Sequence, residues 1–251
     1  VSADDDDEER RKRSKDREAR AKKALDVIGK LEAQRKSRVI AIIHRENLES
    51  DYLAINDLED VLAALHNTPE DKPLDIVLHT LGGGSLEATQ IARAIKAHKG
   101  RTTAFIPYYA MSAGTFIALA CDEIVMSPQA CLGPIDPQYG FPAATFVNVT
   151  RQKPPEATSD VFLAYADISK KALLESKEEA CELMQGTYSH DGSCSITDEL
   201  SSGKWTHGRP ISVTVAREMG LNINTAIPRE VFDLVRAHRV PYKGGPSVWF
   251  R

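Results

Sequence analysis

The sequence contains no apolar run approaching the ~18 residues that a membrane-spanning helix needs. Its first residues are charged where a secretory signal peptide would carry an apolar core. We therefore expect a cytoplasmic protein. A strong charge of either sign is also missing, because the formal net charge of the 251 residues is -4 at pH 7. Nucleic-acid-binding proteins are usually strongly basic, so no nucleic-acid partner is expected.

Cysteine is scarce and is not arranged for metal binding. None of the four cysteines belongs to a C-x-x-C pair or lies beside histidines at the spacing of zinc ligands. We interpret them as reduced, mostly buried thiols, and we expect neither a metal site nor an organic cofactor. They are Cys121, Cys131, Cys181 and Cys194.

The first part of the chain differs in composition from the rest. It opens acidic, turns basic, and carries few apolar residues before Leu25, Ile28 and Leu31, which share one helical face. We interpret residues 1–37 as a charged helical extension and residues 38–251 as the globular domain. The extension is either solvated or a docking helix for a partner subunit or an anionic membrane surface, which would make the protein membrane-associated. The chain does not begin with methionine, which hints at a trimmed or partial sequence.

From residue 39 onward, short β-branched runs alternate with segments of helical periodicity. This alternation predicts an α/β core, in which ligands bind at the carboxyl ends of the strands. The predicted strands are 39–44, 75–80, 102–106 and 123–126, and the predicted helices are 51–66, 86–98, 112–121 and a long polar helix at 159–188.

Two unusual loops follow predicted strands. The first, "LGGGS", is not a G-x-x-x-x-G-K-[ST] phosphate loop. Its glycines either allow a tight turn or let free N–H groups face a carbonyl oxygen, as in an oxyanion hole. In the second loop, "MSAG", Ser112 is either a helix N-cap or a nucleophile. Both loops end neighbouring strand units at one edge, so the serine would lie opposite the glycine donors.

Three segments together resemble a known family: "LHTLGGGSLEATQIARAI", "MSAGTFIALACDEIVMSPQACLGPIDPQ" and "GKWTHGRPISVTVAREMGLNI". Over about residues 38–240 the chain resembles the serine dehydrogenase proteinases, within the Clp protease/crotonase superfamily and close to the signal peptide peptidase A group. The resemblance implies a spiral of ββα units with additional C-terminal helices. It also implies that Ser112 is the nucleophile and that backbone N–H groups of Gly82 or Gly83 and of Ala113 form the oxyanion hole.

The proton acceptor is harder to assign. Clp-type relatives carry a histidine about two dozen residues after the serine, but that region here reads "LGPIDPQYG" and contains none. Signal-peptide-peptidase-like relatives use a lysine some forty residues beyond the serine, which corresponds to Lys153. A lysine acts as a base only when neutral, so its pKa would have to fall from ~10.4 through burial or a neighbouring cation such as Arg151. Lys153 is otherwise a surface lysine, and Lys170 and Lys171 are the other lysine candidates.

Several further residues are candidates for accessory roles. His207 would orient Lys153, contact substrate, brace the turn at Trp205, or serve as the base itself. Asp136, between two prolines, is expected to fix a turn that walls the cleft. We interpret His44 and His79 as structural, although His79 precedes the glycine turn.

These inferences together predict a serine endopeptidase that hydrolyses proteins or peptides through a Ser112–Lys153 dyad. We expect a homo-oligomer with recessed sites, in which helix 159–188 is a subunit contact or a lid. Two alternatives stay open. A crotonase-like enzyme would use the same oxyanion hole on an acyl-coenzyme A thioester, with Glu87 as its nearby acid. A non-catalytic relative would serve as a scaffold or adaptor.

Overall fold

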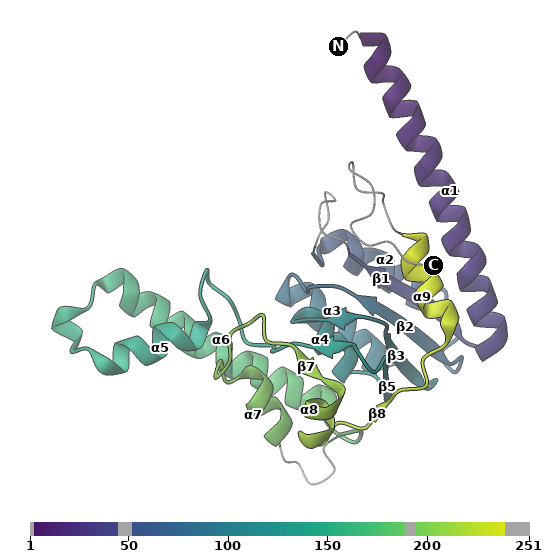
Figure 1. Ribbon diagram of the computed structural model, residues 1–251. Coiled ribbons are helices and arrows are strands. Elements are labelled where there is room, and N and C mark those ends of the chain that lie inside the picture. The colour runs from purple at the N-terminus through teal and green to yellow at the C-terminus, as the bar shows by residue number, and fades with distance from the viewer. Residues whose placement is uncertain (1–2, 45–51, 189–193, 239–251) are drawn as a thin grey trace.

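The computed structural model describes residues 3–44, 52–188 and 194–238, and Figure 1 shows a mixed α/β body from which two helical segments project. The body is built on a five-stranded parallel sheet of order β1-β2-β3-β5-β8, and a small three-stranded sheet, β4-β6-β7, lies beside it. The strands are β1 (Arg38–Ile43), β2 (Leu74–His79), β3 (Thr102–Ile106), β4 (Tyr109–Ala110), β5 (Glu123–Met126), β6 (Cys131–Leu132), β7 (Ile211–Ser212) and β8 (Ile223–Asn224).

Helices cover both faces of the large sheet. Alternate residues of a strand point to opposite faces, so Val77 joins a cluster with α1 and α9, while Ile76 and Leu78 join the larger cluster with α2, α3 and α4. Every residue of β2 and β3 is buried, as expected for central strands of a parallel sheet. The helices are α1 (Ala3–Arg35), α2 (Ile55–His66), α3 (Ser85–Lys96), α4 (Ala113–Leu119), α5 (Ala143–Gln152), α6 (Asp160–Met184), α7 (Ser195–Ser201), α8 (Val213–Glu218) and α9 (Arg229–Ala237).

The predicted α/β class is confirmed, and so is the Clp-type arrangement of its units. Strands β3 and β4 are followed by α4, and β5 and β6 by α5, which are the expected ββα repeats. β3 and β5 have the predicted bounds. The two-residue strands β4, β6, β7 and β8 were not predicted, because they are too short to show a period of two. Residue 51, the predicted start of the first helix after β1, lies outside the described residues.

The two halves of α1 have different surroundings. Figure 1 shows the N-terminal half extending away from the body, whereas the C-terminal half lies beside α9. In that second half Ala24, Val27 and Leu31 are buried with Val231 and Leu234 of α9. Residues before position 37, where the composition changes, therefore share a hydrophobic cluster with residues of the globular domain.

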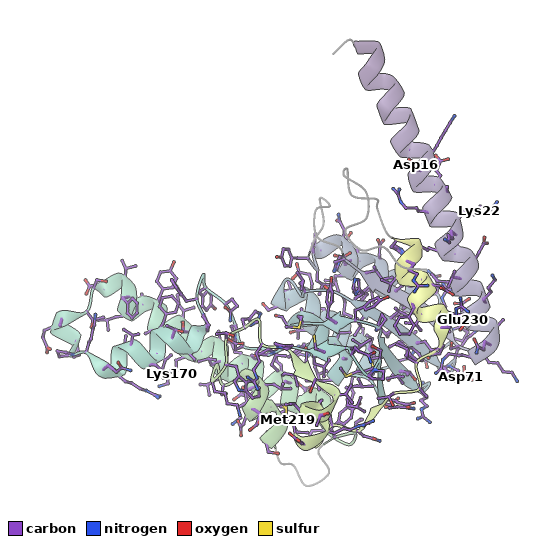
Figure 2. All side chains as sticks on the ribbon, viewed as in Figure 1. Asp16, Lys22, Asp71, Lys170, Met219 and Glu230 are labelled. Carbon is purple, nitrogen blue, oxygen red and sulfur yellow. A yellow bond between two sulfur atoms is a disulfide. The ribbon has the colours of Figure 1, made fainter. Side chains whose placement is uncertain are left out.

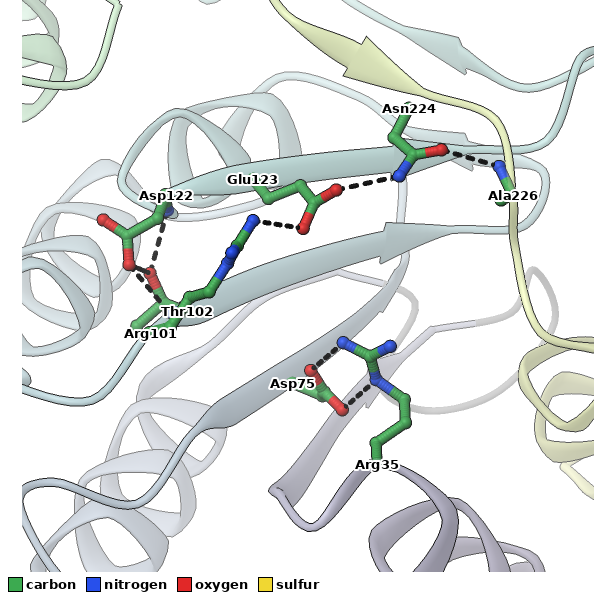
Figure 3. Close-up of polar contacts among 8 residues, drawn as sticks. All are labelled: Arg35, Asp75, Arg101, Thr102, Asp122, Glu123, Asn224 and Ala226. Atoms are coloured by element: carbon green, nitrogen blue, oxygen red, sulfur yellow. Dashed lines mark hydrogen bonds and ion pairs between the residues drawn. The ribbon is translucent and has the colours of Figure 1, made fainter.

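Ion pairs and a hydrogen bond near the amino ends of β2, β3 and β5 join the sheet to α1 and its strands to one another (Figure 3). Arg35, the last residue of α1, donates from Nε and Nη2 to the two carboxylate oxygens of the buried Asp75 on β2, at 2.6 and 3.1 Å. Arg101 and Asn224 both donate to Glu123, which connects β3, β5 and β8. This edge is opposite to the one at which the two unusual loops lie.

Helices α5 and α6 form an arm that leaves the body (Figure 1). The ring of Phe146 on α5 stacks on Tyr165 of α6 and contacts Phe162, which holds the two helices together. The C-terminal part of α6 returns to the body and packs against α3, α4 and α7. The long helix was thus predicted well, but α5 was not.

The expectation of four reduced cysteines is wrong for two of them. Cys181 near the end of α6 and Cys194 before α7 form a disulfide, with their Cα atoms 5.4 Å apart, within the usual range for this bond. The tertiary packing of α6 against α7 brings together two cysteines that no local motif connects. Cys121 and Cys131 are free, the first buried and the second half-buried.

Candidate active site

Ser112 lies in the turn between β4 and α4 with an unusual backbone. Its φ is 51° and its ψ is -117°, and its side chain makes no capping hydrogen bond to the helix that follows. Positive φ costs a non-glycine residue about 1–3 kcal/mol and is maintained only where the surroundings enforce it. A strained serine between a strand and a helix is the geometry of a nucleophile elbow, which exposes the hydroxyl. The N-cap interpretation of Ser112 therefore finds no hydrogen bond to support it.

The glycine turn passes directly against this serine. A Cβ atom added to Gly82 would lie 2.7 Å from Cβ of Ser112 and 3.1 Å from the backbone nitrogen of Ala113. Gly82 also has a φ of 112°, which L-residues rarely adopt. Only glycine allows the turn to approach the serine this closely.

The N–H groups near the serine differ in their partners. The Gly82 N–H donates to Thr80 Oγ1 at 3.0 Å. Gly83 pairs with Leu53 as in a parallel ladder, in which Gly82 O and Gly84 N bond to Leu53, so the N–H of Gly83 points to the other side. Within the described part of the chain, neither Gly83 N–H nor Ala113 N–H has an acceptor.

Asp136 and His207 form the other wall of the site. The Asp136 side chain is buried, and its Oδ1 lies 2.9 Å from Nδ1 of His207. Oδ2 of the same carboxylate accepts a hydrogen bond from Gln138 Nε2 at 2.7 Å. Because a carboxylate only accepts, Nδ1 of His207 must carry a hydrogen, which leaves the lone pair on Nε2 of the neutral ring.

These groups line one cavity of about 810 Å³, a volume within the usual range of ligand sites. It brings together the glycine turn, the serine turn and the His207–Asp136 pair. Its other walls come from α3 and from the part of α6 that returns to the body. The lining residues include Gly83, Leu86, Ser112, Ala113, Phe116, Asp136, Ala172, Ser176 and His207.

The lysine candidates lie elsewhere. Lys153 caps the C-terminus of α5, is exposed, and is not among the residues that line the cavity. Figure 2 shows Lys170 on the projecting arm, also exposed. The Asp167 carboxylate, 2.5 Å from the Lys171 amine, raises the pKa of that lysine by hydrogen bonding and charge, which keeps the amine protonated.

The remaining histidine candidates, the free cysteines and Glu87 do not line the cavity or are not suited to act as nucleophile or base. His79 packs its ring against Tyr109, and His44 is buried behind the glycine turn. Burial raises the pKa of the free thiols Cys121 and Cys131, so neither is activated as a thiolate nucleophile. Glu87 is folded back against Gly84 at the start of α3.

Sequence reasoning did not foresee the pairing of His207 with Asp136, since 71 residues separate them.

The fold and its strained serine place the molecule in the class of ClpP-fold proteins. ClpP1 from Listeria monocytogenes matches over 80% of this chain and 98% of its own, with a TM-score of 0.51 and 16% identity. A serine-to-alanine mutant of 1510-N, a membrane-bound stomatin-specific protease, matches over 80% of this chain and 89% of its own, with a TM-score of 0.50 and 17% identity. At these identities the two structures establish the fold alone.

Within that class, the chain belongs to the ClpP-like SDH-type serine proteinases, whose family profile matches residues 12–251. The match includes most of the charged segment that the three motifs had left outside. Two proteins of Methanocaldococcus jannaschii are similar over most of their length. Uncharacterized protein MJ1495 is 42% identical over 239 residues, covering 92% of this chain and 82% of its own. Uncharacterized protein MJ0137 is 39% identical over 234 residues, covering 90% and 82%.

Proposed function

We propose that this protein hydrolyses peptide bonds in proteins or peptides with Ser112 as the nucleophile. Its family supports a serine peptidase in general. The observation that carries the assignment to particular residues is the His207–Asp136 pair, which lines the same cavity as the strained serine. Serine triads are recognised by such geometry and occur in several chain orders.

In this mechanism Nε2 of His207 takes the hydroxyl proton as Ser112 Oγ attacks the peptide carbonyl. The oxyanion that forms accepts hydrogen bonds from the N–H groups of Gly83 and Ala113. His207 then gives its proton to the departing amine, which leaves an acyl-enzyme on Ser112. Water, deprotonated by His207, attacks the ester, and His207 returns that proton to Ser112 Oγ as the acid product leaves. Asp136 holds the neutral imidazole in the required tautomer and stabilises the imidazolium that forms in each half of the reaction.

The choice of base departs from the expected Ser112–Lys153 dyad. His207 is supported by its contact with a buried carboxylate and by its position in the cavity. Lys153 stays the alternative base, but an exposed amine outside the cavity would need a rearrangement of the arm to reach Ser112. Of the expected oxyanion donors, Gly83 is favoured over Gly82, whose N–H is already bound to Thr80.

Ser112→Ala is the direct test of the nucleophile. A fluorophosphonate probe should label the wild-type chain at Ser112 and should not label the variant, and hydrolysis of an unfolded protein substrate should disappear with it. Ser202→Ala, which changes an exposed serine outside the cavity, is the matched control and should behave as wild type. Equal labelling of the wild type and Ser112→Ala would refute the proposal.

The same probe and protein substrate, with an acyl-coenzyme A thioester added, distinguish the other two functional classes. A crotonase-like enzyme would turn over an acyl-coenzyme A thioester and leave the unfolded protein intact. A scaffold or adaptor of the same fold would neither react with the probe nor hydrolyse either substrate.

A further inference from the structure

A buried polar pair lies next to the glycine turn, and neither of its residues lines the cavity. Thr80 follows β2 and His44 follows the neighbouring β1, and the two side chains are 1% and 6% exposed. Nδ1 of His44 lies 2.8 Å from Oγ1 of Thr80. The proposed reaction uses neither residue, yet buried polar groups are costly unless they form hydrogen bonds.

The directions of the hydrogen bonds follow from their partners. Thr80 Oγ1 accepts the Gly82 N–H at 3.0 Å. Its own hydrogen can go to Nδ1 of His44 at 2.8 Å or to Gly82 O at 3.4 Å. Nε2 of His44 faces the Asp57 carboxylate 3.4 Å away. Because a carboxylate only accepts, Nε2 carries the hydrogen of the neutral ring, which makes Nδ1 the acceptor of the Thr80 hydroxyl. The result is a chain of hydrogen bonds in which the Gly82 N–H donates to Thr80, the Thr80 hydroxyl donates to His44, and His44 donates toward Asp57.

Thr80 also contacts the serine turn. Its backbone N–H donates to Tyr109 O, and its carbonyl accepts from the Met111 N–H, one residue before Ser112. Its methyl group occupies the space next to Gly114, where an added Cβ would lie 2.7 Å from Cγ2 of Thr80. One buried side chain therefore contacts both loops of the site.

We propose that Thr80, oriented by His44, is a positioning residue that sets the glycine turn for catalysis. By holding the Gly82 N–H away from the cavity, it leaves the next N–H, that of Gly83, as the oxyanion donor. This inference rests on the proposed function, because it concerns the same oxyanion hole. Misplacement of a catalytic group by about 1 Å can cost about a hundredfold in rate.

Thr80→Val tests the hydroxyl, because valine keeps the shape and the methyl contact and removes the hydrogen bonds. We expect fluorophosphonate labelling of Ser112 and kcat to fall about ten- to hundredfold, with KM within about twofold of wild type. Thr80→Ser retains the hydroxyl and should recover most of the rate. Thr68→Val is the matched control, since Thr68 is also buried and its hydroxyl bonds a carbonyl of α2.

His44 supplies the second arm of the test. His44→Leu should slow labelling as Thr80→Val does, and His44→Asn, which restores an acceptor near Nδ1, should recover part of the rate. Because the two residues act in series, the double variant Thr80→Val with His44→Leu should be no slower than the worse single variant. Additive losses, or normal labelling in Thr80→Val, would overturn the inference.

Failure of the proposed function gives a different result. In that case the wild-type chain itself would not be labelled at Ser112. Hydrogen exchange at the Gly82 amide is read independently of activity, and it should accelerate in Thr80→Val but not in Thr80→Ser. Unchanged exchange at Gly82 would overturn the positioning role even in a chain that is active.

Discussion

At the scale of single residues, the candidate site depends on backbone positions that tolerate little change. Ser112 adopts a positive φ without being glycine, and Gly82 lies so near that a Cβ there would meet the Cβ of the serine. Strain of this kind persists where neighbouring structure enforces it. Here the neighbours are the glycine turn on one side and the buried α4 on the other.

The identity of the base is a prediction at this scale. His207→Ala should lower acylation by on the order of 10²–10⁴, the usual contribution of a general base, while Lys153→Met should leave it nearly unchanged. Asp136→Asn should also lower it, because an amide at Oδ1 no longer favours the required tautomer. Stopped-flow or probe-labelling rates measure the effect. Loss in Lys153→Met with activity kept in His207→Ala would return the role to Lys153.

The pH profile checks the base independently. A base must be unprotonated to accept the serine proton, so activity is lost as the pH falls through the pKa of the base. Histidine bases ordinarily give this limb near ~6.5, whereas a lysine ordinarily titrates near ~10.4. We expect the lower limb of kcat/KM to change in His207→Ala but not in Lys153→Met.

At the scale of elements, α1 packs more closely on the body than its polar composition suggests. Its sequence is mostly polar, yet its second half packs on one face of the central sheet and its last residue bonds the buried Asp75. The few apolar residues of the helix are concentrated where it meets α9. A short apolar stripe is enough to attach a helix when a sheet face is otherwise uncovered.

Leu31→Ala and Leu25→Ala form a matched pair for this attachment. Leu31 is 0% exposed and Leu25 is 66% exposed, on the same helix. We expect Leu31→Ala to lower the free energy of unfolding by about 2–5 kcal/mol and Leu25→Ala to change it by less than about 0.5 kcal/mol. Urea titration followed by circular dichroism measures both. Equal effects would mean that α1 does not pack on the body in solution.

At the scale of the whole molecule, the arm of α5 and α6 has large apolar side chains in contact with solvent. Val161, Tyr165 and Ile168 lie at helical spacing on α6 and are all exposed. Contiguous exposed apolar surface of this kind is typical of contact sites between proteins. This surface supports the proposal of a homo-oligomer in which the arm contacts a second copy.

Light scattering tests that proposal. The wild-type chain at micromolar concentration should have a mass at least twice the 27.6 kDa of one chain. Val161→Asp should lower that mass, since it places a charge in the contact. Leu25→Asp, a similar change at an equally exposed leucine of α1, should not. A wild-type mass equal to one chain would disprove the oligomer.

The regular parts of the fold were predictable because their signals are local. β3 and β5 match their predicted bounds, since a run of buried β-branched and apolar residues is characteristic of a central parallel strand. The two-residue strands were not predicted, because they are too short to show a period and form only beside their partner strands. Helix α5 was not predicted either, and it packs against α6. The disulfide between Cys181 and Cys194 was missed because no local motif connects the two cysteines.

The sequence by itself determined the α/β class, the family, and the two loops that carry the candidate nucleophile and the oxyanion donors, because strand, helix and turn signals act over a few residues. Tertiary structure alone decided which groups surround Ser112. The contact between His207 and Asp136, 71 residues apart, exists because the chain after α7 returns along the wall of the cavity formed by residues near β6. Spacing along the chain selected Lys153, and only the folded chain shows that this lysine lies outside the cavity.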